Sequence, residues 1–309
     1  MNDYEGTRNF ESVQPEGSKS PKNGKSDPKK KIAIAIFTIV IAIVLLFCAV
    51  IITKIVYKLN GDSDKTDGSG NNLSYKTVSI PSSDINNGTL LLVEDASDMK
   101  NNPEQLSSTA SDSNGDPYYI GTGSYPKDKL TSDTVKALKA MAQGLYRSTE
   151  VRFVIGYAYD QNATGEECEH VLGTVVDIKQ FGEMAEDNTI SSTALNSDAI
   201  NWLQKNCAKY GFIITVTHSD GSTQLRYVGV AHATYIVKNN ISLSAYTNKL
   251  KDHSPEDTLS IEGADGKNYS VYYVKSTGDD TEVKVPQNYD YEISGNNTDG
   301  FIVTVNLSK

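Results

Sequence analysis

The longest run of apolar residues in this chain lies near its N-terminus. It begins at Ile32, ends at Thr53, contains no charged residue and is rich in Ile, Val and Ala. A helix of these 22 residues would be about 33 Å long, enough to span the hydrocarbon core of a bilayer. The pattern therefore predicts a transmembrane helix over residues 32–53.

The residues on either side of this run predict its orientation. Residues 1–31 are polar, hold seven Lys or Arg and end in three consecutive lysines. Because basic residues stay on the cytoplasmic side, we expect a disordered cytoplasmic tail, a single-pass protein of the cell membrane and an extracellular C-terminal part. A cleaved signal peptide is the alternative, but its apolar region is shorter and ends in small residues. Residues 54–74 are rich in Gly, Ser, Asn and Asp, a composition typical of a flexible linker.

Beyond this linker, apolar residues recur with helical or strand periods. Helical spacing predicts helices over residues 132–145 and 197–210. Short apolar or alternating runs predict strands, separated by loops such as residues 95–116, over residues 88–94, 151–155, 173–178, 212–217 and 224–228. Residues 75–252 are therefore expected to form an α+β domain with a central antiparallel sheet and flanking helices.

The pattern changes after Asp252. Short apolar runs separated by Gly, Asn and Asp then predict strands over residues 269–274, 281–285, 289–293 and 301–306. Residues 253–309 are expected to form a small β unit. A unit of about 55 residues is only marginally stable by itself.

Charge and cysteine content narrow the classes of partner. From residue 59 onward the chain has 20 basic and 34 acidic residues, a net charge of −14. Such a surface argues against nucleic acid or another polyanion as partner. Cys48 lies in the predicted membrane helix, so Cys168 and Cys207 could form one disulfide, which the sequence allows but does not imply.

A histidine and a carboxylate flank a glycine in the middle of the chain. His170, Gly173 and Asp177 have the spacing H-x-x-G-x-x-x-D. Histidine and aspartate are two of the three protein ligands that a catalytic zinc ion needs. They are therefore the first candidates for a metal site.

Several further segments occur in an order that resembles a known family. They are residues 88–94, Gly156-Tyr157, Glu169-His170 with Gly173 and Asp177, Trp202-Leu203, residues 210–213 and 226–229, His232-Ala233, and Leu243 with Tyr246. Together, from about residue 87 to residue 250, they resemble the VanY-type D-alanyl-D-alanine carboxypeptidases. These are zinc enzymes that remove the terminal D-Ala from peptidoglycan stem peptides.

The resemblance implies a role for five positions, of which two match. His170 and Asp177 match the first two zinc ligands. The third ligand, a histidine in the family, falls on Gln224, the glutamate base falls on Gly221, and the arginine that stabilises the oxyanion falls on Ala158. Glutamine is a weak zinc ligand, and loss of a base and of an oxyanion contact each costs roughly 10²-fold or more in rate. The implied site is degenerate, with zinc bound weakly or not at all.

Three neighbouring residues are alternatives for the missing groups. Cys168 would share the face of His170 on an extended segment. His218 lies opposite the face of Gln224 if the turn after it has a two-residue loop, and on the same face if the loop has three residues. Asp220 becomes a candidate base if the alignment shifts by one residue. Without a metal, His170 and Asp177 are expected to form a hydrogen-bonded pair.

The sequence therefore supports several functions. The first is a membrane-anchored module that binds a peptidoglycan stem peptide or another envelope protein and lacks ordinary turnover. The second is an active zinc carboxypeptidase whose rearranged metal site uses Cys168, His218 or Asp220. The third is a spacer or assembly protein whose contacts are made by the β unit after residue 254.

Overall fold

The computed structural model describes residues 73–94, 98–99, 103, 105–109, 118–120, 129–187 and 189–308. Residues 72–309 belong to one compact unit. The predicted cytoplasmic tail, the membrane helix at residues 32–53 and nearly all of the linker lie outside the described residues. Within the described part, no helix has the length and apolar character needed to cross a membrane.

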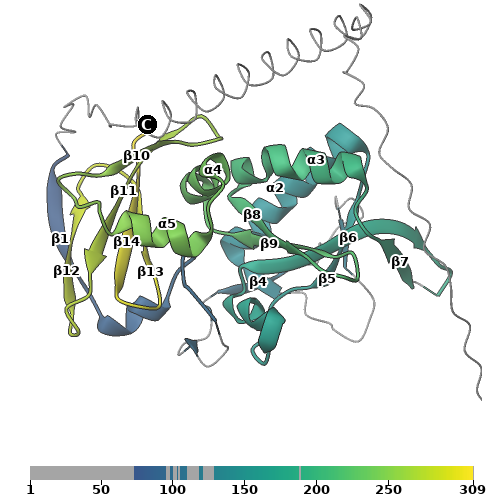
Figure 1. Cartoon of the computed structure of the whole chain (residues 1–309), viewed down its shortest axis with the longest axis horizontal. Coiled ribbons are helices and arrows are strands. Elements are labelled where there is room, and N and C mark those ends of the chain that lie inside the picture. Colours follow the sequence, from purple (N-terminus) through teal and green to yellow (C-terminus); the bar gives the residue numbers. More distant parts are fainter. Residues whose placement is uncertain are drawn as a thin grey trace, which may run out of the picture. The chain divides into compact units, whose positions relative to one another are not determined.

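A six-stranded, mainly antiparallel sheet forms the centre of the first half of this unit (Figure 1). Its strands lie in the order β3 (Tyr118–Ile120), β5 (Phe153–Tyr157), β6 (Val175–Met184), β9 (Thr223–Tyr227) and β8 (Phe212–Thr217), and β7 (Ile190–Thr193) pairs with β6. Only the pairing of β3 with β5 is parallel among these strands. The α+β class predicted from the sequence is observed. A separate pair is formed by β2 (Leu106–Ser108) and β4 (Lys129–Thr131).

Helices α2 (Ser132–Thr149) and α3 (Ser197–Asn206) cover one face of the sheet (Figure 1). Apolar residues recur at helical spacing along one face of α2, and this face is buried: Val135, Leu138, Met141, Ala142 and Leu145. They pack against Val176 and Ile178 of β6 in the main core. Because side chains alternate along a strand, Asp177 faces the opposite side of the sheet. The short 3₁₀ helix η4 (Cys207–Tyr210) continues α3.

The opposite face of the sheet carries a 3₁₀ helix and two short helices. The 3₁₀ helix is η3 (Gly165–Leu172), and the helices are α4 (Val230–Asn239) and α5 (Leu243–Leu250). Another 3₁₀ helix, η1 (Ser82–Asn86), follows the first strand of the described chain. The core around α4 and α5 extends into the C-terminal strands, through Ile261, Val271 and Ile302.

The C-terminal half contains four strands of one sheet and a two-stranded sheet. The larger sheet has the order β10 (Leu259–Glu262), β11 (Asn268–Lys275), β14 (Gly300–Asn306) and β13 (Tyr291–Gly295). In the smaller sheet, β12 (Thr281–Pro286) pairs antiparallel with β1 (Tyr75–Ile80). The sequence analysis assigned residues 75–80 to the carboxypeptidase-like domain, but the structure places this strand in the C-terminal β unit.

Alternation along β11 explains how the C-terminal sheet has two buried faces. Val271 packs with the α4 and α5 core, whereas Tyr272 packs with Val283 and Val285 of β12. The larger sheet is therefore enclosed between helices on one face and the β1 and β12 pair on the other. This second layer gives the small unit a core that its own 55 residues could not supply.

Residues 88–94 were predicted to form a strand, but the structure contains none there. Leu90 and Leu91 are buried as expected, yet the backbone N–H of Leu90 donates to Ser294 Oγ and that of Leu92 donates to the Asn296 carbonyl. The apolar run is therefore an irregular buried segment. Its backbone groups are satisfied by side chains and by the loop after β13 instead of by a strand ladder.

His232 joins the two halves. Its Nδ1 lies 2.8 Å from the hydroxyl of Tyr246 on α5, and its Nε2 lies 2.9 Å from the hydroxyl of Thr304 on β14. His232 is buried in the first turn of α4. Burial without a charged partner lowers the pKa of His232 to about 3.

We expect β1 to contribute directly to stability. Val78 is partly buried against the core between the β1 and β12 pair and the larger sheet, whereas the adjacent Thr77 is exposed. Val78→Asp should lower the free energy of unfolding by about 2 kcal/mol, because it places a charge where a partly buried apolar side chain packs against the core. Thr77→Asp should change it by less than about 0.5 kcal/mol. Urea unfolding of both variants measures the change in the free energy of unfolding. Equal effects would contradict the placement of Val78 on the side of β1 that faces the core and of Thr77 on the exposed side.

We expect His232 to make stability depend on pH. The unfolded chain binds a proton on this histidine below about pH 6.5, and the folded chain does not until about pH 3. Stability should therefore fall as the pH is lowered from 6.5, by up to about 1.4 kcal/mol per unit. The stability difference between the wild type and His232→Gln, measured from pH 7 to pH 4.5, should narrow as the pH falls. A constant difference would show that His232 is not held neutral.

Candidate functional site

A cavity of about 570 Å³ opens on the face of the sheet opposite α2 and α3. Strand pairing places Asp177 of β6 directly beside Gln224 of β9 at this face. The cavity is lined by residues from β5, β6, η3 and the turn between β8 and β9, among them Tyr157, Glu166, Glu167, Asp177, Lys179, His218 and Asp220. The region predicted from the sequence is thus a single cleft.

His170 is fully buried at the end of η3, and one side of its ring is fixed. Its Nδ1 lies 2.8 Å from the carbonyl oxygen of Ala158, and the ring lies beside that of Tyr157 with centroids 4.1 Å apart. Because a carbonyl oxygen only accepts hydrogen bonds, Nδ1 carries the proton and donates it. The lone pair of Nε2 is therefore directed into the cleft.

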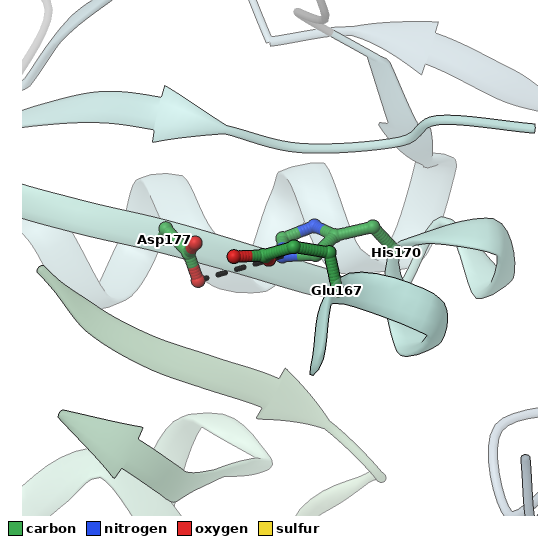
Figure 2. Close-up of side chains that lie close together, drawn as sticks. All are labelled: Glu167, His170 and Asp177. Carbon is green, nitrogen blue, oxygen red and sulfur yellow. Dashed lines mark ion pairs between the residues drawn. The ribbon is translucent and has the colours of Figure 1, made fainter. Parts of the chain in front are cut away.

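Two carboxylates face this nitrogen (Figure 2). His170 Nε2 lies 3.2 Å from Glu167 Oε2 and 3.5 Å from Asp177 Oδ1. Asp177 was predicted from the sequence, whereas Glu167 was not. The segment before His170 was expected to be extended, but it is a 3₁₀ helix, in which residues three apart lie on the same face. A helix predicted over residues 165–172 would have placed Glu167 on the same face as His170.

The donor set at this point fits a cation. Glu167 Oε2 and Asp177 Oδ1 are buried atoms that accept no hydrogen bond within the described part of the chain. Together with His170 Nε2 they lie within 4.8 Å of one another. Two carboxylate oxygens and an imidazole lone pair are all electron-pair donors, so a metal ion would satisfy all three. His170 and Asp177 therefore fit the zinc ion that the resemblance implies.

Gln224 stands where the resemblance places the third ligand, and its amide is oriented by Thr215. The hydroxyl of Thr215 donates to Gln224 Oε1 at 2.7 Å, which turns Gln224 Nε2 toward His170 Nε2 at 3.4 Å. In this orientation the group that faces the histidine is an N–H donor, and an N–H group does not coordinate a metal.

The turn between β8 and β9 settles the position of His218. The backbone N–H of His218 donates to the carbonyl of Ser222, which leaves a three-residue loop with Gly221 at φ +84°. His218 consequently lies on the same side as Gln224, the second of the two arrangements considered from the sequence. Its Nε2 is 3.8 Å from Asp177 Oδ2 and has no hydrogen-bond partner among the described residues.

Asp220 is held by the same turn and is unsuited to act as a base. Its Oδ1 accepts from the backbone N–H and the hydroxyl of Ser222, at 2.9 and 2.6 Å, and its Oδ2 lies 2.9 Å from Lys179 Nζ. The hydrogen bonds from Ser222 and the adjacent Lys179 hold the pKa of Asp220 well below its usual range. A general base works best with a pKa near the operating pH.

The side chain of Cys168 lies away from the cleft at His170 and Asp177. Its Sγ contacts the Glu94 carbonyl at 3.6 Å, and its side chain packs in a cluster with Leu91, Val93 and Val175. The expectation that Cys168 shares the face of His170 fails because η3 is not extended. Cys207 is buried in the main core, where burial raises its pKa to about 11. These two cysteines do not form a disulfide in the structure.

The positions that replace the family's arginine and base carry no charge. Ala158 is fully buried, and its carbonyl binds His170. Gly221 has a left-handed backbone, and a Cβ added there would lie 2.8 Å from the Cβ of Ala194. A glutamate at position 221 would therefore need this turn to change.

A buried ion pair fixes η3 to the sheet. The guanidinium of Arg226, on β9, donates to Glu169 of η3 and to the carbonyl of Leu91. Only 2% of Arg226 is exposed, so this charge depends on its partners. The sequence analysis treated Glu169 and Arg226 only as motif residues. In the structure they place the helix that carries Glu167 and His170 over β6 and β9.

Comparisons with known proteins bear on the family that the sequence resembles. Residues 140–236 match the model of the VanY family, described as D-alanyl-D-alanine carboxypeptidase. A D-alanyl-D-alanine carboxypeptidase of Enterococcus faecium is 38% identical over 114 residues, which cover 34% of this chain and 35% of the relative. This chain thus spans about a third of the length of that relative.

Two solved structures are similar. One is the vancomycin-resistance D,D-dipeptidase VanXYg in complex with a D-Ala-D-Ala phosphinate analogue, with a TM-score of 0.56, 21% identity, and coverage of 75% of this chain and 99% of the other. The LD-carboxypeptidase LdcB matches with a TM-score of 0.36, 22% identity, and coverage of 48% of this chain and 80% of the other. The matched family segment contains His170, Asp177 and Gln224. The resemblance predicted from the sequence is confirmed: residues 140–236 match the model of the VanY family, described as D-alanyl-D-alanine carboxypeptidase.

Proposed function

We propose that this chain binds D-Ala-ended peptidoglycan stem peptides in the cleft around His170 and Asp177, without ordinary carboxypeptidase turnover. The observation that carries this proposal is the replacement of three groups in a retained cleft. Ala158, Gly221 and Gln224 stand where the resemblance implies an arginine, a base and a third zinc ligand. Losing a base and an oxyanion contact together removes roughly 10⁴-fold of rate or more.

The cleft has the size for a short peptide end and one cationic side chain for its carboxylate. Its volume of about 570 Å³ lies within the range of small-molecule sites. Among its described lining residues, Lys179 is the one Lys or Arg side chain, and it is about one-quarter exposed. In this proposal Lys179 receives the terminal carboxylate of the peptide, because a carboxylate bound to an ammonium makes a charge-assisted hydrogen bond.

The proposed location follows from the N-terminal sequence. Residues 32–53 anchor the protein as a single membrane helix, with residues 1–31 in the cytoplasm and the cleft outside the cell. A linker of about 20 residues then lets the folded unit reach cell-wall peptides. Another envelope protein is the alternative partner of the same cleft.

Zinc is compatible with this function. His170 and Asp177 would hold the ion, which when bound supplies a Lewis acid for a peptide carbonyl or carboxylate oxygen. His170 keeps its lone pair available through the proton that Nδ1 donates to Ala158.

An active carboxypeptidase with a rearranged site is the second candidate function. The specific observation in its favour is that Glu167 and His218 approach Asp177 from two sides, although neither occupies a position of the family's motif. His218 Nε2 has no hydrogen-bond partner in the described part of the chain and is placed to take a proton. In this candidate, His218 does the work of the base that Gly221 cannot provide.

Calorimetric titration of the full-length chain in detergent with a D-Ala-D-Ala-ended pentapeptide tests the first proposal. We expect saturable binding that Lys179→Ala weakens by about tenfold, the equivalent of one charge-assisted hydrogen bond. Lys136→Ala, an exposed lysine of α2, should leave binding unchanged. We expect release of D-Ala, followed by chromatography, to remain at background with and without zinc.

The outcomes separate the two functions. Release of D-Ala that is lost in His218→Ala would favour the rearranged enzyme. Absence of binding to D-Ala-ended and L-Ala-ended peptides alike would overturn the stem-peptide proposal.

A further inference from the structure

We propose that Glu167, and not the residue at position 224, completes a divalent-metal site with His170 and Asp177. The sequence motif places a third ligand on β9, at Gln224. The structure instead brings a third carboxylate from η3, the same short helix that carries His170. Compared with the site that the resemblance implies, the third ligand is thus a carboxylate instead of an imidazole. It comes from η3 instead of from β9.

Of the three converging atoms, the two carboxylate oxygens receive no hydrogen bond from the described residues. Asp177 has 7% of its side chain exposed, and its Oδ1 accepts no hydrogen bond from the described residues. Glu167 is exposed along part of its side chain, but its Oε2 is buried and equally unpartnered. Both oxygens point toward His170 Nε2, as Figure 2 shows. Two carboxylates buried this close repel each other unless a cation lies with them.

The protein's own donors do not fill this space. The amide of Gln224 approaches His170 Nε2 at 3.4 Å, but neither Glu167 Oε2 nor Asp177 Oδ1 receives a hydrogen bond from it. His218 lies nearer to the other oxygen of Asp177, at 3.8 Å. A proton on His170 Nε2 could donate a hydrogen bond to one carboxylate only. The negative charge of the second carboxylate would then have no partner. A divalent ion can serve all three atoms at once.

Local structure explains how Glu167 can reach this position. In a 3₁₀ helix the side chains at positions i and i+3 lie one above the other, so Glu167 and His170 point the same way. Gly173, at φ +65°, ends this helix and allows the chain to turn into β6, which carries Asp177. The Arg226 to Glu169 pair then holds η3 in place.

The ligand set also predicts which metals bind. Two carboxylates and one imidazole carry a formal charge of −2 and offer more oxygen than a site with two histidines. Oxygen ligands suit Mn²⁺ and Mg²⁺, whereas imidazole suits Zn²⁺ and Co²⁺. We therefore expect a site that takes Zn²⁺, Co²⁺ and Mn²⁺, with less preference for Zn²⁺ than a site with two histidines.

Co²⁺ titration of the full-length chain in detergent tests this assignment without any activity assay. Visible absorption should show saturable binding of about one Co²⁺ per chain, and competition with Zn²⁺ and Mn²⁺ gives their affinities. Glu167→Gln should weaken binding at least about tenfold, because even changes to groups that only orient a ligand cost 10- to 100-fold. The neighbouring Glu166→Gln, which lines the same cavity, is the matched control and should change affinity less than about threefold.

A variant at position 224 tests whether Gln224 is the third ligand instead of Glu167. Gln224→Ala should leave Co²⁺ affinity within about threefold, whereas a Gln224 ligand would make it fall as steeply as Glu167→Gln does. The proposal is overturned if the wild-type chain shows no saturable binding, if Glu167→Gln binds like the wild type, or if Gln224→Ala is the variant that loses metal. Circular dichroism of each variant confirms that it is folded. Because no peptide is present, these results stand apart from the stem-peptide proposal.

Discussion

The buried guanidinium of Arg226 is the contact on which the cleft depends. It holds Glu169 of η3 and the carbonyl of Leu91, so β9, the 3₁₀ helix and the irregular N-terminal segment meet at one charged group. Removing one partner of a buried ion pair typically costs about 3 to 5 kcal/mol, because the other charge stays buried without compensation. The positions of Glu167 and His170 relative to Asp177 follow from this anchor. The geometry of the cleft thus depends on an ion pair that lies outside its lining residues.

The sequence predicted those parts of the fold that depend on local periodicity. The helical spacing on α2, and the strand runs at β5, β6, β8 and β9, correspond to observed elements. The family motif placed Gln224 at the third ligand position, and strand pairing puts it beside Asp177. Local pattern sufficed here because each of these elements buries one face against the same core.

Other features could not be read from local pattern because distant residues decide them. Residues 75–80 alternate like any edge strand, and only β12, about 200 residues later, determines their partner. Residues 88–94 are apolar enough for a strand, but side chains and loops satisfy their backbone instead. Glu167 was missed because the helix type of residues 165–172 decides which neighbour shares a face with His170. The side of the sheet on which His218 lies depends on the length of the loop after it, which the sequence does not determine. The hydrogen bond from His218 to Ser222 shows this length.

The pairing of β1 with β12 determines where a force applied on the N-terminal side of the chain would enter the described unit. Any pull transmitted along the chain from its N-terminal side enters the described unit at the start of β1. The antiparallel ladder to β12 and the valine layer beneath it bear this load before any strand of the cleft does. If the chain is anchored on its N-terminal side as proposed, this ladder therefore shields the relative positions of Asp177 on β6 and of Glu167 and His170 on η3 from tension in the chain.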